Sequence, residues 1–260
     1  MKKAVGYRDR TTHKGPSIES WGNTRRREAW EKTVQNESMA VSRNNGSDIY
    51  ISRTKKYQRY WKIINQYVEL QANHRILDIG CREYGLIDFL NQGIRYGLDP
   101  VIDVRNEYHQ NSGVFPIKGI GEYLPLKERS FDRIIMTNIL DHVYQPLKVL
   151  EESRRMLKKD GILIIALHVF SYTNILKLLR VMVGLKRDRF HMHTFTRKSI
   201  EKFITGVGFT LLASESIPYD AAGRSTLKVW LYNKLLIYLD HILDSRIYAP
   251  SEDILLICRK

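Results

Sequence analysis

The sequence predicts an α/β protein in which a mostly parallel β-sheet is covered by helices. Between residues 75 and 170, short apolar segments with strand character alternate with segments of helical periodicity. The strand-like segments read "RILDIG", "IRYGLD", "FDRIIMTN" and "GILIIALHVF". This alternation is typical of parallel sheets with crossover helices. Ligands bind such sheets at the carboxyl ends of the strands, so the functional site is expected there.

Two helices are expected between these strands. The first opens with "LIDFL" and is closed by Gly93. The second begins at Pro146, which suits a first helical position because proline lacks an amide hydrogen, and has apolar residues every three or four positions. Lys158 and Lys159 are expected in its final turn and Gly161 beyond its end, which is typical of a helix C-terminus.

The N-terminal part of the chain differs from the rest. Residues 1–51 are basic, polar and weakly periodic, which predicts a partly ordered arm. From Ser52 the pattern predicts a helix with one aromatic face, formed by Tyr57, Tyr60, Trp61, Ile64, Tyr67 and Val68. We expect this helix to dock on the domain, with core packing favoured over ligand contact for its aromatic face. The main domain is therefore expected to span residues 52–260.

Composition limits the class of protein. A chain of 260 residues with 43% apolar residues can bury a core. No segment reaches the ~20 apolar residues of a membrane span and no signal-peptide core is present, so the cytoplasm is the expected compartment. The two cysteines, Cys81 and Cys258, are expected to be reduced. The net charge of +14 favours anionic partners such as nucleic acid, phosphorylated metabolites or an acidic membrane surface.

The segment "DIGCREYG" after the first strand has the pattern of a nucleotide-binding turn with one substitution. Gly80 and Gly85 hold the first and last places of G-x-G-x-x-G, but Arg82 holds the middle place, where a pyrophosphate needs close backbone approach. Asp99 ends the next strand 19 residues after Gly80, where a carboxylate can accept both ribose hydroxyl hydrogens. A nucleoside without a pyrophosphate therefore fits better than NAD or FAD. The alternative is a tight turn with an incidental acidic strand end.

Four successive segments carry a family resemblance. "ILDIGCREYG", "YGLDP", "GIGEYLPLKERSFDRIIMTNILDHVYQP" and "MLKKDGILIIALH" resemble, in order and interval, the motifs of class I S-adenosylmethionine-dependent methyltransferases. A later segment, "HMHTFTRKSIEKFITGVGFTLL", is similar to one common in bacterial and archaeal methyltransferases found with sugar, polysaccharide and lipid-linked pathways. The first resemblance is specific and the second is moderate.

The resemblance implies a doubly wound, Rossmann-like sheet of seven strands that ends in an antiparallel hairpin. The segments "GFTLLASESIP" and "EDILLICR" would supply that hairpin. Two helical insertions, at about 171–190 and 225–243, are expected to cap the acceptor site or to cover the sheet. Their basic and apolar faces also suit a phosphorylated lipid carrier or an anionic membrane surface, which implies possible peripheral contact with the inner face of the membrane.

The resemblance also implies the cofactor, S-adenosyl-L-methionine, and its binding residues. Asp99 would hold the ribose. The loop around the methionine part, the flank of the adenine and the floor beneath the sulfonium would come from Asp78, Gly80, Cys81, Gly85, Gly121, Glu122, Asn138 and Ile139. Arg82 and Tyr84 depart from the small residues of the glycine loop, and Ile120 stands where many relatives have an aspartate. The Arg82 guanidinium either pairs with the cofactor's carboxylate or points to solvent.

Histidines are the residues to consider for catalysis, because a general base is needed mainly when the methyl acceptor is a hydroxyl. His142 faces the acceptor side in the family, although a structural role is favoured for it, and His191 and His193 would share one face of an extended segment. His168 is a further residue to examine. No third ligand is placed near His191 and His193, so no metal site is expected.

The expected function is methyl transfer to a small-molecule, sugar or lipid-linked saccharide acceptor, at oxygen. The basic residues of the two insertions favour an anionic acceptor. Two alternatives stay open. An RNA methyltransferase is favoured by the charge and the basic arm, but "TNIL" is not an N-P-P-Y-like tetrad. A methyltransferase-like binding protein without catalysis is favoured by Arg82 and Ile120.

Overall fold

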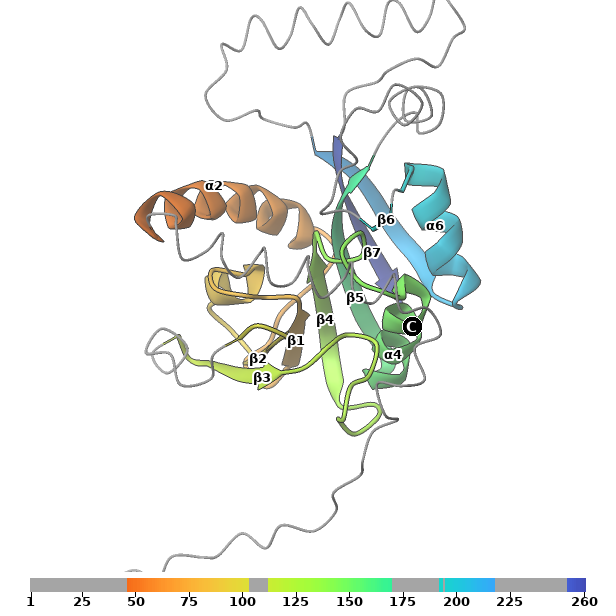
Figure 1. The fold of residues 1–260 in the computed structure, drawn as a ribbon, viewed down its shortest axis with the longest axis horizontal. Helices are drawn as coiled ribbons and strands as arrows, with labels where there is room; N and C mark the ends of the chain where they lie inside the picture. The colour runs from red at the N-terminus through yellow and green to blue at the C-terminus, as the bar shows by residue number, and fades with distance from the viewer. Residues whose placement is uncertain (1–45, 103–111, 170–191, 194, 218–251) are drawn as a thin grey trace, which may run out of the picture.

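The computed structural model describes residues 46–102, 112–169, 192–193, 195–217 and 252–260, which form one sheet with helices on both faces (Figure 1). The elements are α2 (Gly46–Ile64), β1 (Arg75–Ile79), the 3-10 helix η2 (Leu86–Phe89), β2 (Ile94–Asp99), β3 (Val114–Lys118), β4 (Phe131–Thr137), α4 (Pro146–Met156), β5 (Leu157–Val169), α6 (Arg197–Gly206), β6 (Thr210–Ile217) and β7 (Glu252–Arg259).

The seven strands lie in the order β3-β2-β1-β4-β5-β7-β6. The first five strands of that order pair in parallel, and β7 pairs antiparallel with both β5 and β6. The predicted doubly wound sheet and its C-terminal hairpin are therefore confirmed. Because the strand order reverses between β1 and β4, the carboxyl ends of these two strands flank the crevice in which such folds bind ligands.

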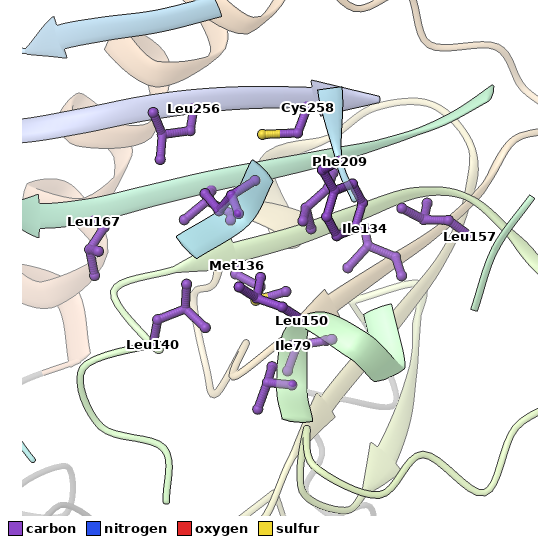
Figure 2. Close-up of a cluster of buried hydrophobic side chains, with 14 of the residues drawn as sticks. Ile79, Ile134, Met136, Leu140, Leu150, Leu157, Leu167, Phe209, Leu256 and Cys258 are labelled. Atoms are coloured by element: carbon purple, nitrogen blue, oxygen red, sulfur yellow. The ribbon is translucent and has the colours of Figure 1, made fainter. Parts of the chain in front are cut away.

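Each face of the sheet has its own buried core. On one face, α4 and α6 pack on the cluster shown in Figure 2, which includes Ile79, Met136, Leu150 and Leu256. On the other face, α2 and η2 cover a second cluster to which Tyr57 and Tyr60 belong. The arrangement explains the near-continuous apolar composition of β4 and β5, since strands buried on both sides have no solvent face.

Helix α2 docks on the domain as its aromatic pattern predicts. It ends before the last two residues of the predicted aromatic face. It begins at Gly46 and ends at Ile64, so Tyr67 and Val68 lie beyond it. Tyr57, Tyr60, Ile64 and Val68 are buried, whereas Tyr67 is exposed. The arm predicted at residues 1–51 and the helix start at Ser52 are wrong for residues 46–51, which belong to α2. Residues 1–45 of that arm and the insertions at 171–190 and 225–243 lie outside the described residues. No described helix is long and apolar enough to cross a membrane.

The prediction of a helix from Leu86 to Gly93 is wrong, because only the short 3-10 helix η2 forms there, and it ends before Leu90. The Arg95 guanidinium reaches the carbonyl oxygens of Ile87 and Leu90, at 3.4 and 2.7 Å. A side chain thus satisfies carbonyls that a longer α-helix would satisfy with its own amides. Gly93 lies just before β2 with φ 89, a left-handed conformation that favours glycine.

The predicted end of the next helix is also wrong. Helix α4 ends at Met156, and Lys158 and Lys159 belong to β5. The amides of Arg129 and Ser130 donate to the carbonyls of Arg155 and Met156 at 3.1 and 2.8 Å, so a loop distant in sequence satisfies the last turn. Lys158 then pairs with Asp132 on the neighbouring strand, at 2.8 Å.

Candidate functional site

A cavity of about 330 Å³ opens at the carboxyl ends of β1, β2 and β4. This volume falls within the range of small-molecule sites. Its wall combines the loops after these strands with one side of α2: it is lined by Arg53, Lys56, Tyr57, Ile79, Gly80, Cys81, Arg82, Leu98, Asp99, Pro100, Val101, Ile120, Gly121, Glu122, Thr137, Asn138, Ile139, His142 and Val143. The cavity therefore occupies the position that the strand order predicts for a ligand.

The turn after β1 has a left-handed backbone at three of its residues. Gly80, Arg82 and Tyr84 have φ values of 78, 45 and 59. A Cβ on Gly80 would lie 2.6 Å from Ile139 Cδ1, so this position accepts only glycine without a shift. Arg82 adopts the conformation that a glycine would take more easily, and the turn keeps its shape despite the substitution.

Asp99 ends β2 at the cavity, and only 3% of the residue is exposed. Its Oδ2 accepts a hydrogen bond from the Arg82 amide at 3.2 Å, and its Oδ1 accepts one from the Val101 amide at 2.9 Å. The two bonds fix the plane of the carboxylate. A carboxylate has the capacity for about four hydrogen bonds.

Asp78 and Gly85 support the turn from below and do not line the cavity. Asp78 is fully buried, and its Oδ2 accepts from the Ile87 amide at 3.2 Å. Its Oδ1 has no hydrogen-bond partner among the described residues, and burial raises its pKa well above the ordinary value. A Cβ on Gly85 would lie 2.5 Å from the Cys81 carbonyl oxygen, so Gly85 allows the turn to close on itself.

Glu122 holds the two loops on the other side of the cavity together. The residue is 2% exposed, and its Oε1 accepts from the amides of Tyr144 and Gln145 at 2.9 and 3.2 Å. Burial raises the pKa of Glu122, and these backbone hydrogen bonds oppose that effect. Gly121 packs closely, because a Cβ there would lie 3.0 Å from Ile79 Cγ2.

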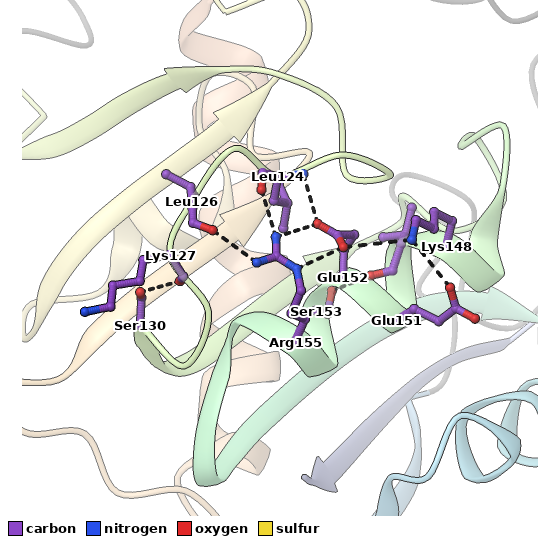
Figure 3. A network of polar contacts seen from close by, with 10 residues as sticks. Leu124, Leu126, Lys127, Ser130, Lys148, Glu151, Glu152, Ser153 and Arg155 are labelled. Atoms are coloured by element: carbon purple, nitrogen blue, oxygen red, sulfur yellow. Dashed lines mark hydrogen bonds and ion pairs between the residues drawn. The ribbon is translucent and has the colours of Figure 1, made fainter. Parts of the chain in front are cut away.

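A network of polar contacts anchors the same loop to α4 (Figure 3). The Arg155 guanidinium donates to the carbonyl oxygens of Leu124 and Leu126, at 2.8 and 3.2 Å, and binds Glu152 at 2.7 Å. Glu152 in turn accepts from the Leu124 amide at 3.1 Å. The segment carrying Gly121 and Glu122 is thereby fixed to a helix whose other side is buried in the core.

Asn138 forms the floor of the cavity at the end of β4. Its φ of 51 is left-handed, and its amide donates to the Ala166 carbonyl at 2.8 Å. Its side-chain Oδ1 is buried and has no hydrogen-bond partner among the described residues. A buried acceptor of this kind at a cavity wall is suited to a donor on a ligand. Ile139 beside it covers Gly80.

A profile of the methyltransferase domain family matches residues 52–214, more than half of the chain. The chain belongs to the methyltransferase domain family. The resemblance carried by its sequence motifs is confirmed by this match and by the strand order.

Curated relatives of this methyltransferase match it over part of their length. Uncharacterized proteins of Mycobacterium tuberculosis and Mycobacterium bovis are each 29% identical to it over 160 residues. The match covers 60% of this chain and 53% of each relative. The chain therefore spans about half the length of the curated relatives it matches.

Solved structures share the fold of this methyltransferase at low identity. A Thermotoga maritima protein described as a possible histamine N-methyltransferase has a TM-score of 0.59 and 18% identity, covering 89% of this chain and 99% of that one. A Haemonchus contortus phosphoethanolamine N-methyltransferase, solved with S-adenosylhomocysteine, has a TM-score of 0.54 and 14% identity, covering 78% and 52%. The [4+2]-cyclase SpnF has a TM-score of 0.53 and 16% identity, covering 78% and 80%. The fold thus occurs with more than one reaction.

Most of the residues that the family resemblance implies for the cofactor gather at the cavity wall. They are Gly80, Cys81, Arg82, Asp99, Gly121, Glu122, Asn138 and Ile139. The polar atoms and the close-packed glycine of this wall fit a nucleoside with an amino-acid tail. The family and its structural neighbours imply the use of S-adenosylmethionine.

The three candidate histidines differ in their surroundings. His142 lines the cavity, and its Nε2 lies 3.8 Å from Asp141 Oδ1. The His193 amide binds the Asp141 carbonyl, and its Nε2 lies 3.0 Å from the Val143 carbonyl oxygen, so the ring braces the loop after β4. His191 lies outside the described residues.

Helix α2 contributes three cavity residues that the motifs did not identify. Arg53, Lys56 and Tyr57 line the wall, and Arg53 also reaches the carbonyl oxygens of Glu83 and Tyr84, at 2.5 and 3.2 Å. The helix is thereby connected to the turn after β1. A spacing of three and four residues places these side chains on the same helix face as Tyr60. That spacing is the sequence signal from which their position at the cavity could have been predicted.

Proposed function

We propose that this methyltransferase binds S-adenosylmethionine in the cavity and transfers the methyl group to oxygen of a small-molecule, sugar or lipid-linked saccharide acceptor. The observation that carries the proposal is the Asp99 carboxylate, fixed by two backbone amides at the cavity beside the turn of Gly80. It is suited to accept both ribose hydroxyls. The cofactor supplies an activated methyl group, so the chain has to orient an acceptor and exclude water.

Further residues are assigned by their place in the cavity. Gly80, Cys81 and Arg82 would surround the methionine part, and Asn138 with Ile139 would lie beneath the sulfonium. The cavity wall also includes two cations from α2, Arg53 and Lys56. Positive charge at that position supports an acceptor that carries an anionic group, such as a phosphate or carboxylate.

The sugar or lipid-linked acceptor is supported by the likeness of residues 191–212 to methyltransferases of such pathways. We place the reaction in the cytoplasm, with peripheral contact at the inner face of the membrane where the acceptor is lipid-linked. The basic segments around residues 171–190 and 225–243 support that contact, because lysines and arginines beside apolar residues favour anionic lipid surfaces.

The test is transfer of a labelled methyl group to a panel of nucleotide sugars, lipid-linked saccharides and bulk RNA, with Asp99→Ala as the control protein. Label in a saccharide, lost in Asp99→Ala, is the expected result. Label in RNA alone would favour the RNA alternative. Binding of S-adenosylhomocysteine without transfer to any acceptor would favour a binding protein without catalysis.

A further inference from the structure

One guanidinium at the cavity wall is held in place by the backbone of a neighbouring turn. Arg53 belongs to α2, lines the cavity and is half-buried. Its Nη1 donates to the carbonyl oxygens of Glu83 and Tyr84, at 2.5 and 3.2 Å, in the turn after β1. Because a guanidinium is planar and rigid, these two bonds restrict the directions in which its other N–H groups can point.

The remaining N–H groups of Arg53 can serve a ligand. A guanidinium carries five N–H donors, and Nη1 holds two of them. Among the described residues, Nε and Nη2 of Arg53 have no hydrogen-bond acceptor, and no carboxylate lies within ion-pair distance of the side chain. A half-buried cation of this kind in a cavity is suited to an anionic ligand, because the anion would supply the counter-charge that the protein does not.

The chemistry of the unused donors favours a carboxylate. The Nε–H and one Nη2–H of a guanidinium point in the same direction. They can therefore donate two parallel hydrogen bonds to the two oxygens of one carboxylate. A lysine at this position could supply the charge but not the paired geometry.

Arg53 and Asp99 contact the same short segment of the turn. Asp99 Oδ2 accepts from the Arg82 amide at 3.2 Å, and Arg53 donates to the carbonyls of the next two residues, Glu83 and Tyr84. Both side chains line the same cavity. A nucleoside whose ribose hydroxyls bind Asp99 can therefore extend its tail along this segment toward Arg53.

We propose that Arg53 binds the carboxylate of S-adenosylmethionine with two parallel hydrogen bonds, so that α2 forms part of the cofactor site; this rests on the proposed function. Arg53 then donates to the turn after β1 through Nη1 and to the ligand through Nε and Nη2. One side chain thereby joins the helix, the turn and the cofactor. Lys56, which lies 3.4 Å from Asp253 and also lines the cavity, is the cation of α2 that is left for an anionic acceptor.

Arg82 is the competing residue for the same carboxylate, because it also lines the cavity. The Arg82 amide binds Asp99, which fixes the backbone of that residue in the turn. In Arg53 the guanidinium itself is held, by two backbone carbonyls. A donor that is already oriented loses less conformational entropy when the ligand binds, so we assign the carboxylate to Arg53.

Calorimetric titration of the full chain with two ligands tests the assignment. The ligands are S-adenosylhomocysteine and its decarboxylated form, which differ only in the carboxylate. The wild type should bind S-adenosylhomocysteine about 10- to 100-fold more tightly than the decarboxylated form. Arg53→Gln should lose this preference, because its Kd for S-adenosylhomocysteine rises while its Kd for the decarboxylated form stays within about twofold of the wild type. Arg53→Lys should keep part of the preference.

Lys55→Gln is the matched control, because it removes the same charge from an exposed residue of α2 that does not line the cavity. It should bind both ligands as the wild type does. An equal loss of affinity for both ligands in Arg53→Gln would show that Arg53 only braces the turn, and this overturns the proposal. A preference that is kept in Arg53→Gln and lost in Arg82→Gln overturns it as well, and assigns the carboxylate to Arg82.

Failure of this proposal can be told apart from failure of the proposed function. A wild-type chain that binds neither ligand contradicts both. A wild-type chain that prefers S-adenosylhomocysteine, with the same preference in Arg53→Gln, overturns the role of Arg53 alone. Thermal unfolding shows whether each variant is folded. If Arg53→Gln is not, the preference of Arg53→Lys decides, and a full preference in that variant overturns the proposal.

Discussion

The β2 side of the cavity and the buried Asp253 site between β5 and β7, called here the β2 end and the β5 end, are built in different ways. At the β2 end, Asp99 is oriented by the amides of Arg82 and Val101, which are 17 and 2 residues away in sequence. At the β5 end, His168 is held by Asp253, 85 residues away, and the same carboxylate binds Tyr60 from 193 residues away. The first end is made by local backbone, and the second is assembled from side chains of distant elements. The geometry of the first should therefore resist substitution of the side chains that surround Asp99, and the geometry of the second should not.

The largest effect on stability is expected where the backbone of the β2 end is changed. Gly80→Ala places a Cβ at φ 78 and 2.6 Å from Ile139 Cδ1. Left-handed strain and overpacking together should lower the free energy of unfolding by about 3 kcal/mol. Gly206→Ala is the matched control, because nothing lies within 4 Å of its Cβ. Denaturant titration of both variants checks the prediction, and an equal stability of the two would contradict it.

The turn beneath the β2 end and the β5 end should respond oppositely to acid, because Asp78 and Asp253 have opposite pKa shifts. The pKa of Asp253 is lowered to about 2 in the folded chain, so its ionised carboxylate stabilises the fold at any pH above the pKa of an aspartate in the unfolded chain. This contribution of about 2 kcal/mol is lost as the pH falls from about 4 to 2. Burial raises the pKa of Asp78 well above its ordinary value, so its ionised form destabilises the fold and acid relieves that penalty.

Asp253→Asn and Asp78→Asn separate these two contributions. Compared with the wild type, Asp253→Asn should be less stable at pH 7 and approach it below pH 4. Asp78→Asn should be more stable at pH 7, and its advantage should shrink as the pH falls toward 4. Thermal unfolding over this pH range is the measurement, and shifts of the same sign in both variants would refute the contrast.

The smallest effect is expected at Arg82. Its φ of 45 suits glycine, so Arg82→Gly should raise the free energy of unfolding by about 0.5 kcal/mol, after the added freedom of the unfolded chain is subtracted. If the guanidinium pairs with the cofactor's carboxylate, the same variant should bind S-adenosylmethionine more weakly, and most clearly at low salt. Calorimetry at two salt concentrations checks this, and tighter binding by the variant would show that Arg82 obstructs the site.

The same difference between the ends explains how much the sequence predicts. Gly80, Asp99 and the strands between them follow from local patterns, because strand register fixes where each strand ends. The contributions of Lys56 and the pairing of His168 with Asp253 depend on how α2 and β7 dock, which no local pattern carries. The early end of α4 was missed for a related reason: its last carbonyls bind the distant amides of Arg129 and Ser130.

The central claim is that the β2 end binds the cofactor and the β5 end stabilises the fold. Calorimetric titration of S-adenosylmethionine into Asp99→Ala and His168→Gln tests it most directly, with Asp132→Ala, whose carboxylate pairs with Lys158 away from the cavity, as the control. Asp99→Ala should weaken binding by about 2–3 kcal/mol, because both ribose hydroxyls lose a charged acceptor. His168→Gln and Asp132→Ala should bind as the wild type does. Unchanged affinity in Asp99→Ala, or an equal loss in His168→Gln, would contradict the account.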